Sequence, residues 1–139
     1  MIYEFTLFGQ PVTKKNSLRK YKSVVLPSRA FVEYEKACHL QISRLAIPHI
    51  TEPLVMTVKY YLHNKRRPDL LGLLQATSDI LQDEYKRVGG KRVCVKEWLY
   101  TDDALIYGYG DSRIVGIDRA NPRAEIRICV LSGQICTKI

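Results

Sequence analysis

The sequence predicts a single domain over residues 1–139 of the α/β (α+β) class, with strands packed against two main helices. A chain of 139 residues has the length of one compact domain, which removes roughly two thirds of its surface from water on folding. Apolar and polar residues alternate over 2–8 and 54–62, the period of half-buried strands, whereas apolar residues recur every three or four positions over 31–45. No repeat, low-complexity tract or linker divides the chain.

The first strand and the first helix are delimited by the sequence itself. The strand Ile2–Phe8 places its apolar residues on one side. Ser28 has a side chain suited to capping a following helix, and Pro48 ends the helical pattern. His39 and His49, in or just beyond this helix, lack the spacing of a metal site and are interpreted as structural. The helix carries a core-facing stripe that consists of Phe31, Tyr34, Cys38, Ile42 and Leu45.

Between these two elements lies a strongly basic segment. Residues 14–22 read KKNSLRKYK and contain five cations, few apolar residues and no periodicity. We expect an exposed basic loop here rather than a core element. Because the cations stand without compensating carboxylates, we interpret Lys14, Lys15, Arg19 and Lys20 as contacts for DNA phosphates. The alternative is a solvated stretch that has no partner.

A second strand, Leu54–Leu62, runs into a cationic turn that contains Arg66 and Arg67, which we also assign to phosphate contacts. Asp69 follows at the position of a helix cap, where the positive end of the helix dipole favours its carboxylate. The helix after Asp69 is strongly apolar and is therefore expected to be largely buried; its apolar residues are Leu70, Leu71, Leu73, Leu74, Ile80 and Leu81.

The remainder of the chain is predicted to be mainly β-structure. A charged stretch at 82–90 ends in glycine, and a β-like run from Arg92 to Tyr100 then leads to the pair Asp102 and Asp103. Two further strands are expected after a turn, at Ile114–Ile117 and Ala124–Val130.

The charge balance favours a polyanionic partner, with nucleic acid as the leading candidate. Lys and Arg total 22 against 14 Asp and Glu, a net charge of +8. The four cysteines include no Cys-x-x-Cys pair, so structural zinc is not expected. No apolar run approaches the roughly 18 residues of a membrane span, and the N-terminus lacks a signal-peptide pattern. We therefore expect a cytoplasmic protein without membrane contact.

Three aspartates carry the chemistry that we predict: Asp69 at a helix start, and Asp102 with Asp103 before a strand. Hard cations such as Mg²⁺ take oxygen ligands and keep several waters, so one or two carboxylates from separate segments can hold them. A bound ion could activate water and stabilise a phosphodiester transition state. Nearby cations would reduce the repulsion between these carboxylates and DNA phosphates. The same residues taken alone also suit helix caps and turns, where aspartate is common.

Four segments, in order and over nearly the whole chain, strengthen the first interpretation: GQPVTKKNS, RRPDLLGLLQATSDIL, TDDALI and GDSRIVGIDRANPRAEI. Together they resemble the RusA-type family of Holliday junction resolvases. The resemblance implies a homodimer with a mixed sheet and helices, Mg²⁺ or Mn²⁺ at a carboxylate cluster, and paired nicks across a four-way DNA junction in a bacterial or phage setting. A symmetric dimer suits such a substrate because two related sites can address two related strands.

The resemblance assigns roles to individual aspartates. Asp69 matches the first Asp of the family's Asp-Leu-Asp-Asn motif, and Asp102 and Asp103 match its Asp-Asp pair, which implies these three as catalytic metal ligands. Asp103 is the stronger candidate of the pair. Asp79 matches an Asp late in the motif helix. At about 1.5 Å per residue it lies roughly 15 Å from Asp69 along the axis, so it is expected to orient the Asp-Asp segment rather than share the ion of Asp69.

Three positions depart from the family motif and leave two main hypotheses open. Leu71 stands where the family has its second Asp, Gly72 where it has Asn, and Gln75 where it has Lys. In the first hypothesis the protein is a junction endonuclease, with Asp111 or Asp118 in place of the missing carboxylate. In the second it is a non-catalytic junction-binding protein that has lost part of the metal site. A basic protein-interaction module is the third class.

Overall fold

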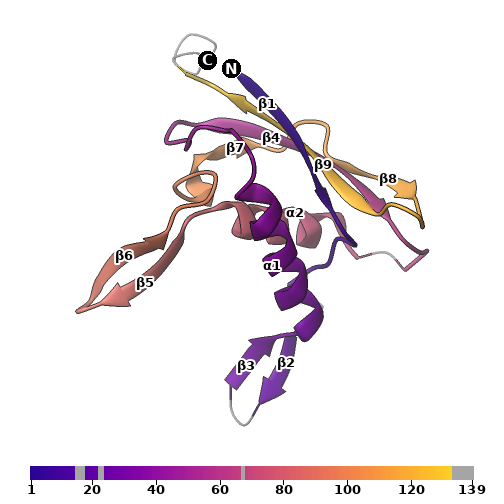
Figure 1. The fold of residues 1–139 in the computed structure, drawn as a ribbon, viewed down its shortest axis with the longest axis horizontal. Coiled ribbons are helices and arrows are strands. Elements are labelled where there is room, and N and C mark those ends of the chain that lie inside the picture. Colours follow the sequence, from indigo (N-terminus) through magenta and orange to yellow (C-terminus); the bar gives the residue numbers. More distant parts are fainter. Residues whose placement is uncertain (15–17, 22–23, 67, 133–139) are drawn as a thin grey trace.

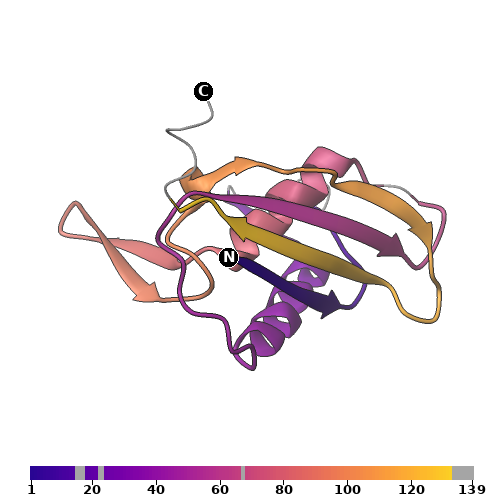
Figure 2. The same ribbon diagram turned by 90° about the horizontal axis from the view of Figure 1, so that it is seen from above.

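A mixed five-stranded sheet forms one layer of the molecule, and two helices, α1 (Arg29–Ile42) and α2 (Leu70–Leu81), cover one of its faces (Figure 1, Figure 2). The computed structural model describes residues 1–14, 18–21, 24–66 and 68–132, apart from the side chains of 18–21 and 24–27. These residues form a single α+β domain. Neither helix among them is long and apolar enough to cross a membrane.

Strand β4 (Leu54–Leu62) is the centre of the sheet and makes it mixed. Strand β9 (Arg123–Val130) lies between β4 and β1 (Ile2–Phe8) and is antiparallel to both. On its other edge β4 pairs in parallel with two short strands in succession, β7 (Ile106–Gly108) near its start and β8 (Arg113–Ile117) near its end. The bounds predicted for β1 and β4 are confirmed, and β8 and β9 each begin one residue before the predicted position.

The core lies between this sheet and the two helices. Alternate residues of β4 point into it, and Leu54, Met56, Val58, Tyr60 and Leu62 are all at most 1% exposed. The predicted stripe of α1 is confirmed for Phe31, Tyr34, Cys38 and Ile42, which are buried, and Leu45 lies beyond the end of the helix. The cap is also confirmed, because the Ser28 hydroxyl accepts a hydrogen bond from the Phe31 amide at 3.2 Å.

Two hairpins project from the body (Figure 1), and the sequence predicted neither of them as a hairpin, although the β-like run expected from Arg92 is confirmed for Arg92–Lys96. The expected loop at 14–22 is wrong for Leu18–Tyr21, which form strand β2 because they pair with β3 (Val24–Pro27). The stretch at 82–90 contains strand β5 (Glu84–Val88), which pairs with β6 (Lys91–Lys96). Gly89 and Gly90 join β5 to β6 with φ of 58° and 78°. A two-glycine connection with positive φ is typical of a tight hairpin turn.

Candidate functional site

One face of α2 stays open to solvent. Leu71, Gln75 and Asp79 follow one another at four-residue intervals, so they lie on the same face of the helix. Leu71 is 76% exposed, Gln75 is exposed and Asp79 is half-buried. The other residues of the helix from Gly72 onward are buried. Of the motif positions that the sequence singled out on this helix, Leu71 and Gln75 are therefore on an accessible surface and Gly72 is buried.

Asp69 stands at the N-cap position of α2, as predicted, but its side chain makes no capping hydrogen bond. Its carboxylate instead packs against Gly72. A Cβ atom built at Gly72 would lie 2.6 Å from Asp69 Oδ1 and 3.0 Å from Thr13 Cγ2, so a larger residue does not fit there. A glycine inside a helix lowers stability by about 0.5–1 kcal/mol relative to alanine. The close approach of Asp69 and Thr13 explains why a glycine is nevertheless found at position 72. The side chain of Asp69, an exposed residue, therefore lies directly over Gly72.

Asp102 and Asp103 lie beside the other end of α2. The Asp102 carboxylate caps a short 3-10 turn, Asp103–Leu105, by accepting from the Ala104 amide at 2.8 Å, and it lies 3.4 Å from Arg92 Nη1. The Asp103 amide donates to Gln82 Oε1 at 3.1 Å, which ties the turn to the residue that follows α2. The Asp103 residue itself is exposed. Asp102 is thus used in local structure, while Asp103 is presented to solvent.

Asp79, Asp103 and Lys14 are close enough to act on one another electrostatically. Burial raises the pKa of the Asp79 carboxyl above its ordinary value, the Lys14 ammonium opposes this rise, and the negative charge of Asp103 adds to it. The same two carboxylates also contribute to the raised pKa of buried Tyr100, for which burial is the main cause. The Asp79 carboxyl, in the last part of α2, is therefore within electrostatic range of one cation, Lys14, and of one other acid, Asp103.

The three predicted metal ligands are not brought together. Asp69 precedes the first turn of α2 and Asp103 contacts Gln82 after its last turn. A helix of 12 residues spans about 18 Å. Within the described part of the chain, Asp69, Asp102 and Asp103 form no set of three ligand atoms within 4.8 Å of one another. The expected convergence of these three residues on one ion is not seen, because α2 lies between Asp69 and the Asp102–Asp103 pair.

Asp111 and Asp118 do not replace the missing carboxylate. Asp111 is 3.4 Å from Arg113 Nη1 and borders a hollow with Thr57 and Lys59 on the sheet face that the helices leave open. Asp118 is 2.9 Å from Arg123 Nη1 and accepts from the Asn121 amide in the turn before β9. Both are held in local ion pairs away from α2.

The predicted phosphate contacts are only partly within the described residues. Lys14 lies in the group just described, with its ammonium also 6.0 Å from the centre of the Phe31 ring. Arg66 is exposed, and its amide donates to Asn64 Oδ1 at 2.9 Å. Lys15 and Arg67 lie outside the described residues, as do the side chains of Arg19 and Lys20 in β2.

A second titratable group lies at the base of the β5–β6 hairpin. The ligand atoms of His49, Asp83 and Glu97 lie within 4.8 Å of one another, a composition and spacing that could hold a metal ion. Asp83 is 3% exposed, and its carboxylate already accepts from the Trp98 amide at 2.8 Å and contacts His49 Nε2 at 2.8 Å. In this arrangement the buried carboxylate fastens three chain segments together.

Sequence reasoning named Asp79 only as a residue that orients the Asp-Asp segment, and it missed the group around Asp83. The four-residue spacing of Leu71, Gln75 and Asp79 was the signal that could have placed Asp79 on the same face as the motif positions. No local pattern joins His49 to Asp83, because these residues meet only through the tertiary fold. No model of a known protein family matches this chain, and a search of curated proteins found no match.

Proposed function

We propose that this protein is a RusA-like, structure-specific endodeoxyribonuclease that acts on four-way DNA junctions with Mg²⁺, and that Asp79 and Asp103 are its principal carboxylates. The observation that carries the proposal is the electrostatic proximity of these two acids and Lys14 at the exposed face of α2. The net charge of +8 supports a polyanionic substrate. The order of the motif segments supports the RusA-type assignment and a homodimeric assembly.

The pair suits Mg²⁺, which proteins bind through one or two carboxylates together with waters and substrate phosphates. When bound, the ion would polarise a phosphate oxygen and lower the pKa of a bound water. The half-buried position of Asp79 supports a role as an oriented acid, and exposed Asp103 is accessible to a DNA strand. Lys14 would offset the repulsion between the two carboxylates and an approaching phosphate.

Asp102 serves this site as a positioning residue. Its carboxylate holds the turn that carries Asp103, through the Ala104 amide on one side and Arg92 on the other. Loss of that cap would leave the turn free to move, so the place of Asp103 relative to α2 would no longer be fixed. A role in orientation explains why the family-like pair of aspartates is useful even though only one of them is exposed.

The test is cleavage of a synthetic four-way junction and of linear duplex of the same sequence, across a Mg²⁺ titration. We expect nicking of the junction in preference to the duplex, and a loss of about 100-fold or more in Asp103→Asn. Asp111→Asn is the matched control, since it makes the same chemical change on the open sheet face and should cleave like the wild type. Intact junctions at every Mg²⁺ and Mn²⁺ concentration would refute the proposal.

A second candidate is a junction-binding protein without catalytic activity. It is favoured by Leu71, which is 76% exposed where the resemblance implies a carboxylate, and by Gln75 where it implies a cation. An exposed leucine can neither bind a hard cation nor neutralise a phosphate. This candidate predicts salt-sensitive binding of the junction with no product in the same assay.

A further inference from the structure

We propose that the β5–β6 hairpin is a DNA-binding arm that enters a groove of the duplex next to the junction. This inference deepens the proposed function, because it takes DNA as the partner and assigns a surface to it. The arm comprises Glu84–Lys96, a segment far in sequence from the expected basic loop near Lys14. Figure 1 shows it projecting from the sheet and helices.

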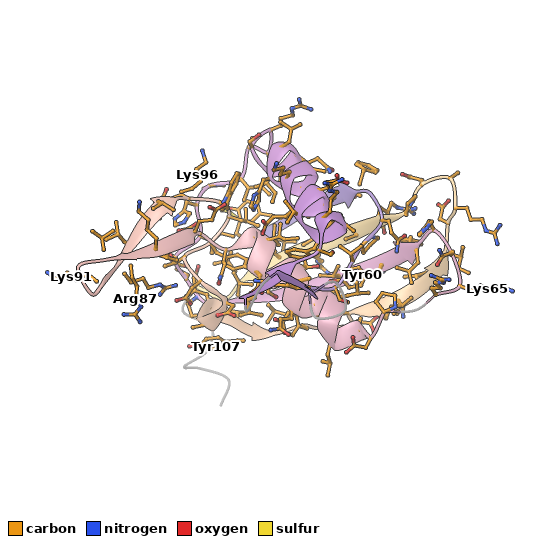
Figure 3. The ribbon with its side chains drawn as sticks, turned by 90° about the horizontal axis from the view of Figure 1, so that it is seen from below. Tyr60, Lys65, Arg87, Lys91, Lys96 and Tyr107 are labelled. Carbon is orange, nitrogen blue, oxygen red and sulfur yellow. The ribbon has the colours of Figure 1, made fainter. Side chains whose placement is uncertain are left out.

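The arm carries a large excess of positive charge. Its five cations stand against one carboxylate, Glu84, and every residue of both strands is exposed except the half-buried Tyr85. Figure 3 shows Arg87 and Lys91 near the outer end of the arm, with Lys96 nearer the body. Clustered cations on an exposed element provide the sequence-independent part of DNA affinity. The cations of the arm are Lys86, Arg87, Lys91, Arg92 and Lys96.

The dimensions of the arm suit a groove. Five residues of β5 extend about 17 Å at 3.3 to 3.4 Å per residue, and the B-DNA major groove, about 12 Å wide, admits a two-stranded β-ribbon. The tip is narrow, because Gly89 and Gly90 carry no side chains and no atom lies within 4 Å of a Cβ built at either of them. A narrow tip can approach base edges that a bulky loop would not reach.

The register of the two strands places two lysines and two valines on the same face of the arm. Lys86 pairs with Val93 and Val88 pairs with Lys91, so these four side chains lie together. The valines on this face are unusually open, with Val88 52% and Val93 42% exposed. Ammonium groups can contact phosphates while the aliphatic groups meet sugars and thymine methyl groups.

The opposite face fixes the arm to the body. The Arg92 guanidinium lies 3.6 Å from the centre of the Tyr85 ring and 3.4 Å from Asp102 Oδ2. The Tyr85 hydroxyl donates to the Thr101 carbonyl at 2.7 Å, and the Trp98 indole donates to Glu84 Oε1 at 2.9 Å. The arm is therefore tied to the segment 101–102 just before Asp103, by Tyr85 near its base and by Arg92 near its tip, so a duplex bound along the arm would lie beside the proposed site.

The positive charge of the arm favours DNA, rather than a second copy of the chain, as the partner that binds this face. Five cations and one acid give the arm a net charge of +4, and two such arms brought together would repel each other. A DNA groove is bordered by phosphates and is complementary to the same surface. An isolated two-stranded hairpin is also only marginally stable in water, so this arm gains from a partner that it can lie against.

The experiment compares two triple variants of the full chain that lose the same charge. The arm variant is Lys86→Gln, Arg87→Gln and Lys91→Gln, and the control is Lys59→Gln, Arg113→Gln and Arg127→Gln, away from the arm. Fluorescence anisotropy gives the Kd for a labelled four-way junction over a range of salt concentrations. We expect the arm variant to bind at least about tenfold more weakly than the control, with a slope of log K against log salt reduced by about 2 to 3.

Equal Kd values for the two triple variants would refute the proposal that the arm binds DNA. If the wild type still cleaves the junction, the nuclease proposal would be unaffected by that result. A wild-type protein that binds the junction but does not cleave it would refute the nuclease proposal. The ratio of the Kd values of the arm variant and the control variant would still test whether the arm binds DNA. No binding by the wild type at low salt would end both. Sedimentation of the same samples detects the competing role: a change of oligomeric state in the arm variant, with an unchanged Kd, would assign the arm to self-association.

Discussion

The two ends of α2 hold aspartates in different ways. At the N-terminal end the Asp69 carboxylate packs against Gly72, where no side chain fits beside it. At the C-terminal end Asp79 and Asp103 share one electrostatic environment with Lys14. The first arrangement is an exposed carboxylate that lies over a helical glycine, and the second is the one that we propose as the site. The comparison teaches that a matching motif position does not by itself make a residue a ligand, since its neighbours decide what its carboxylate can do.

The largest expected effect contrasts the two ends directly. Asp79→Asn should lower junction cleavage about 100-fold, since it removes one of the two carboxylates at the proposed site. Asp69→Asn, the same change about 15 Å away along the helix, should lower it less than tenfold. Single-turnover cleavage at saturating Mg²⁺ measures both. Equal losses of cleavage in the two variants would mean that Asp69 also acts in the site. The proposed difference between the two ends of α2 would then be wrong.

The packed end can be probed through Gly72. Gly72→Ala should destabilise the fold by about 1–3 kcal/mol, because the new methyl group meets the Asp69 carboxylate and Thr13. The clash outweighs the better helix propensity of alanine. Asp69→Ala should recover part of the loss in a double-mutant cycle measured by urea denaturation. A more stable Gly72→Ala protein would contradict the close packing.

The other end depends on a buried tyrosine. The Tyr100 hydroxyl donates to the Ser78 carbonyl at 2.7 Å in the last turn of α2, and the Tyr109 hydroxyl is 2.8 Å from Ser78 Oγ. Tyr100→Phe should cost about 1 kcal/mol of unfolding free energy, since the buried Ser78 carbonyl loses one of its two donors and keeps only the Gln82 amide at 3.2 Å. Tyr109→Phe should cost less, as its hydroxyl is only partly buried. Denaturation curves of the two variants test this order.

The smallest expected effect has the opposite sign. Burial raises the pKa of Asp79, opposed by Lys14 and reinforced by Asp103, so the charged carboxylate is less favourable in the folded than in the unfolded chain. At neutral pH Asp79→Asn should therefore raise the melting temperature slightly, although we expect it to lower cleavage. The Asp69→Asn protein is the control and should show no such gain. A lower melting temperature for Asp79→Asn would show that its carboxylate stabilises the fold.

The strands and helices with strong periodicity could be predicted from the sequence. The alternation in 54–62 and the stripe after Ser28 gave β4 and α1 closely, because both patterns report which residues face the core. The β5–β6 hairpin has no buried face and therefore no such pattern, and only its two glycines signalled a turn. The site was predicted less well, because the motif gave the identity of Asp69 and Asp103 but not the separation that α2 imposes between them.

The contact between Arg92 and Asp102 has a mechanical consequence. Arg92 belongs to the second residue pair from the glycine turn, so a residue near the tip of the hairpin is held against Tyr85 and Asp102. Asp102 is one of those residues, and its other oxygen fixes the turn that begins at Asp103. Two side chains, Arg92 and Asp102, thus connect the outer part of the hairpin to the turn that presents Asp103.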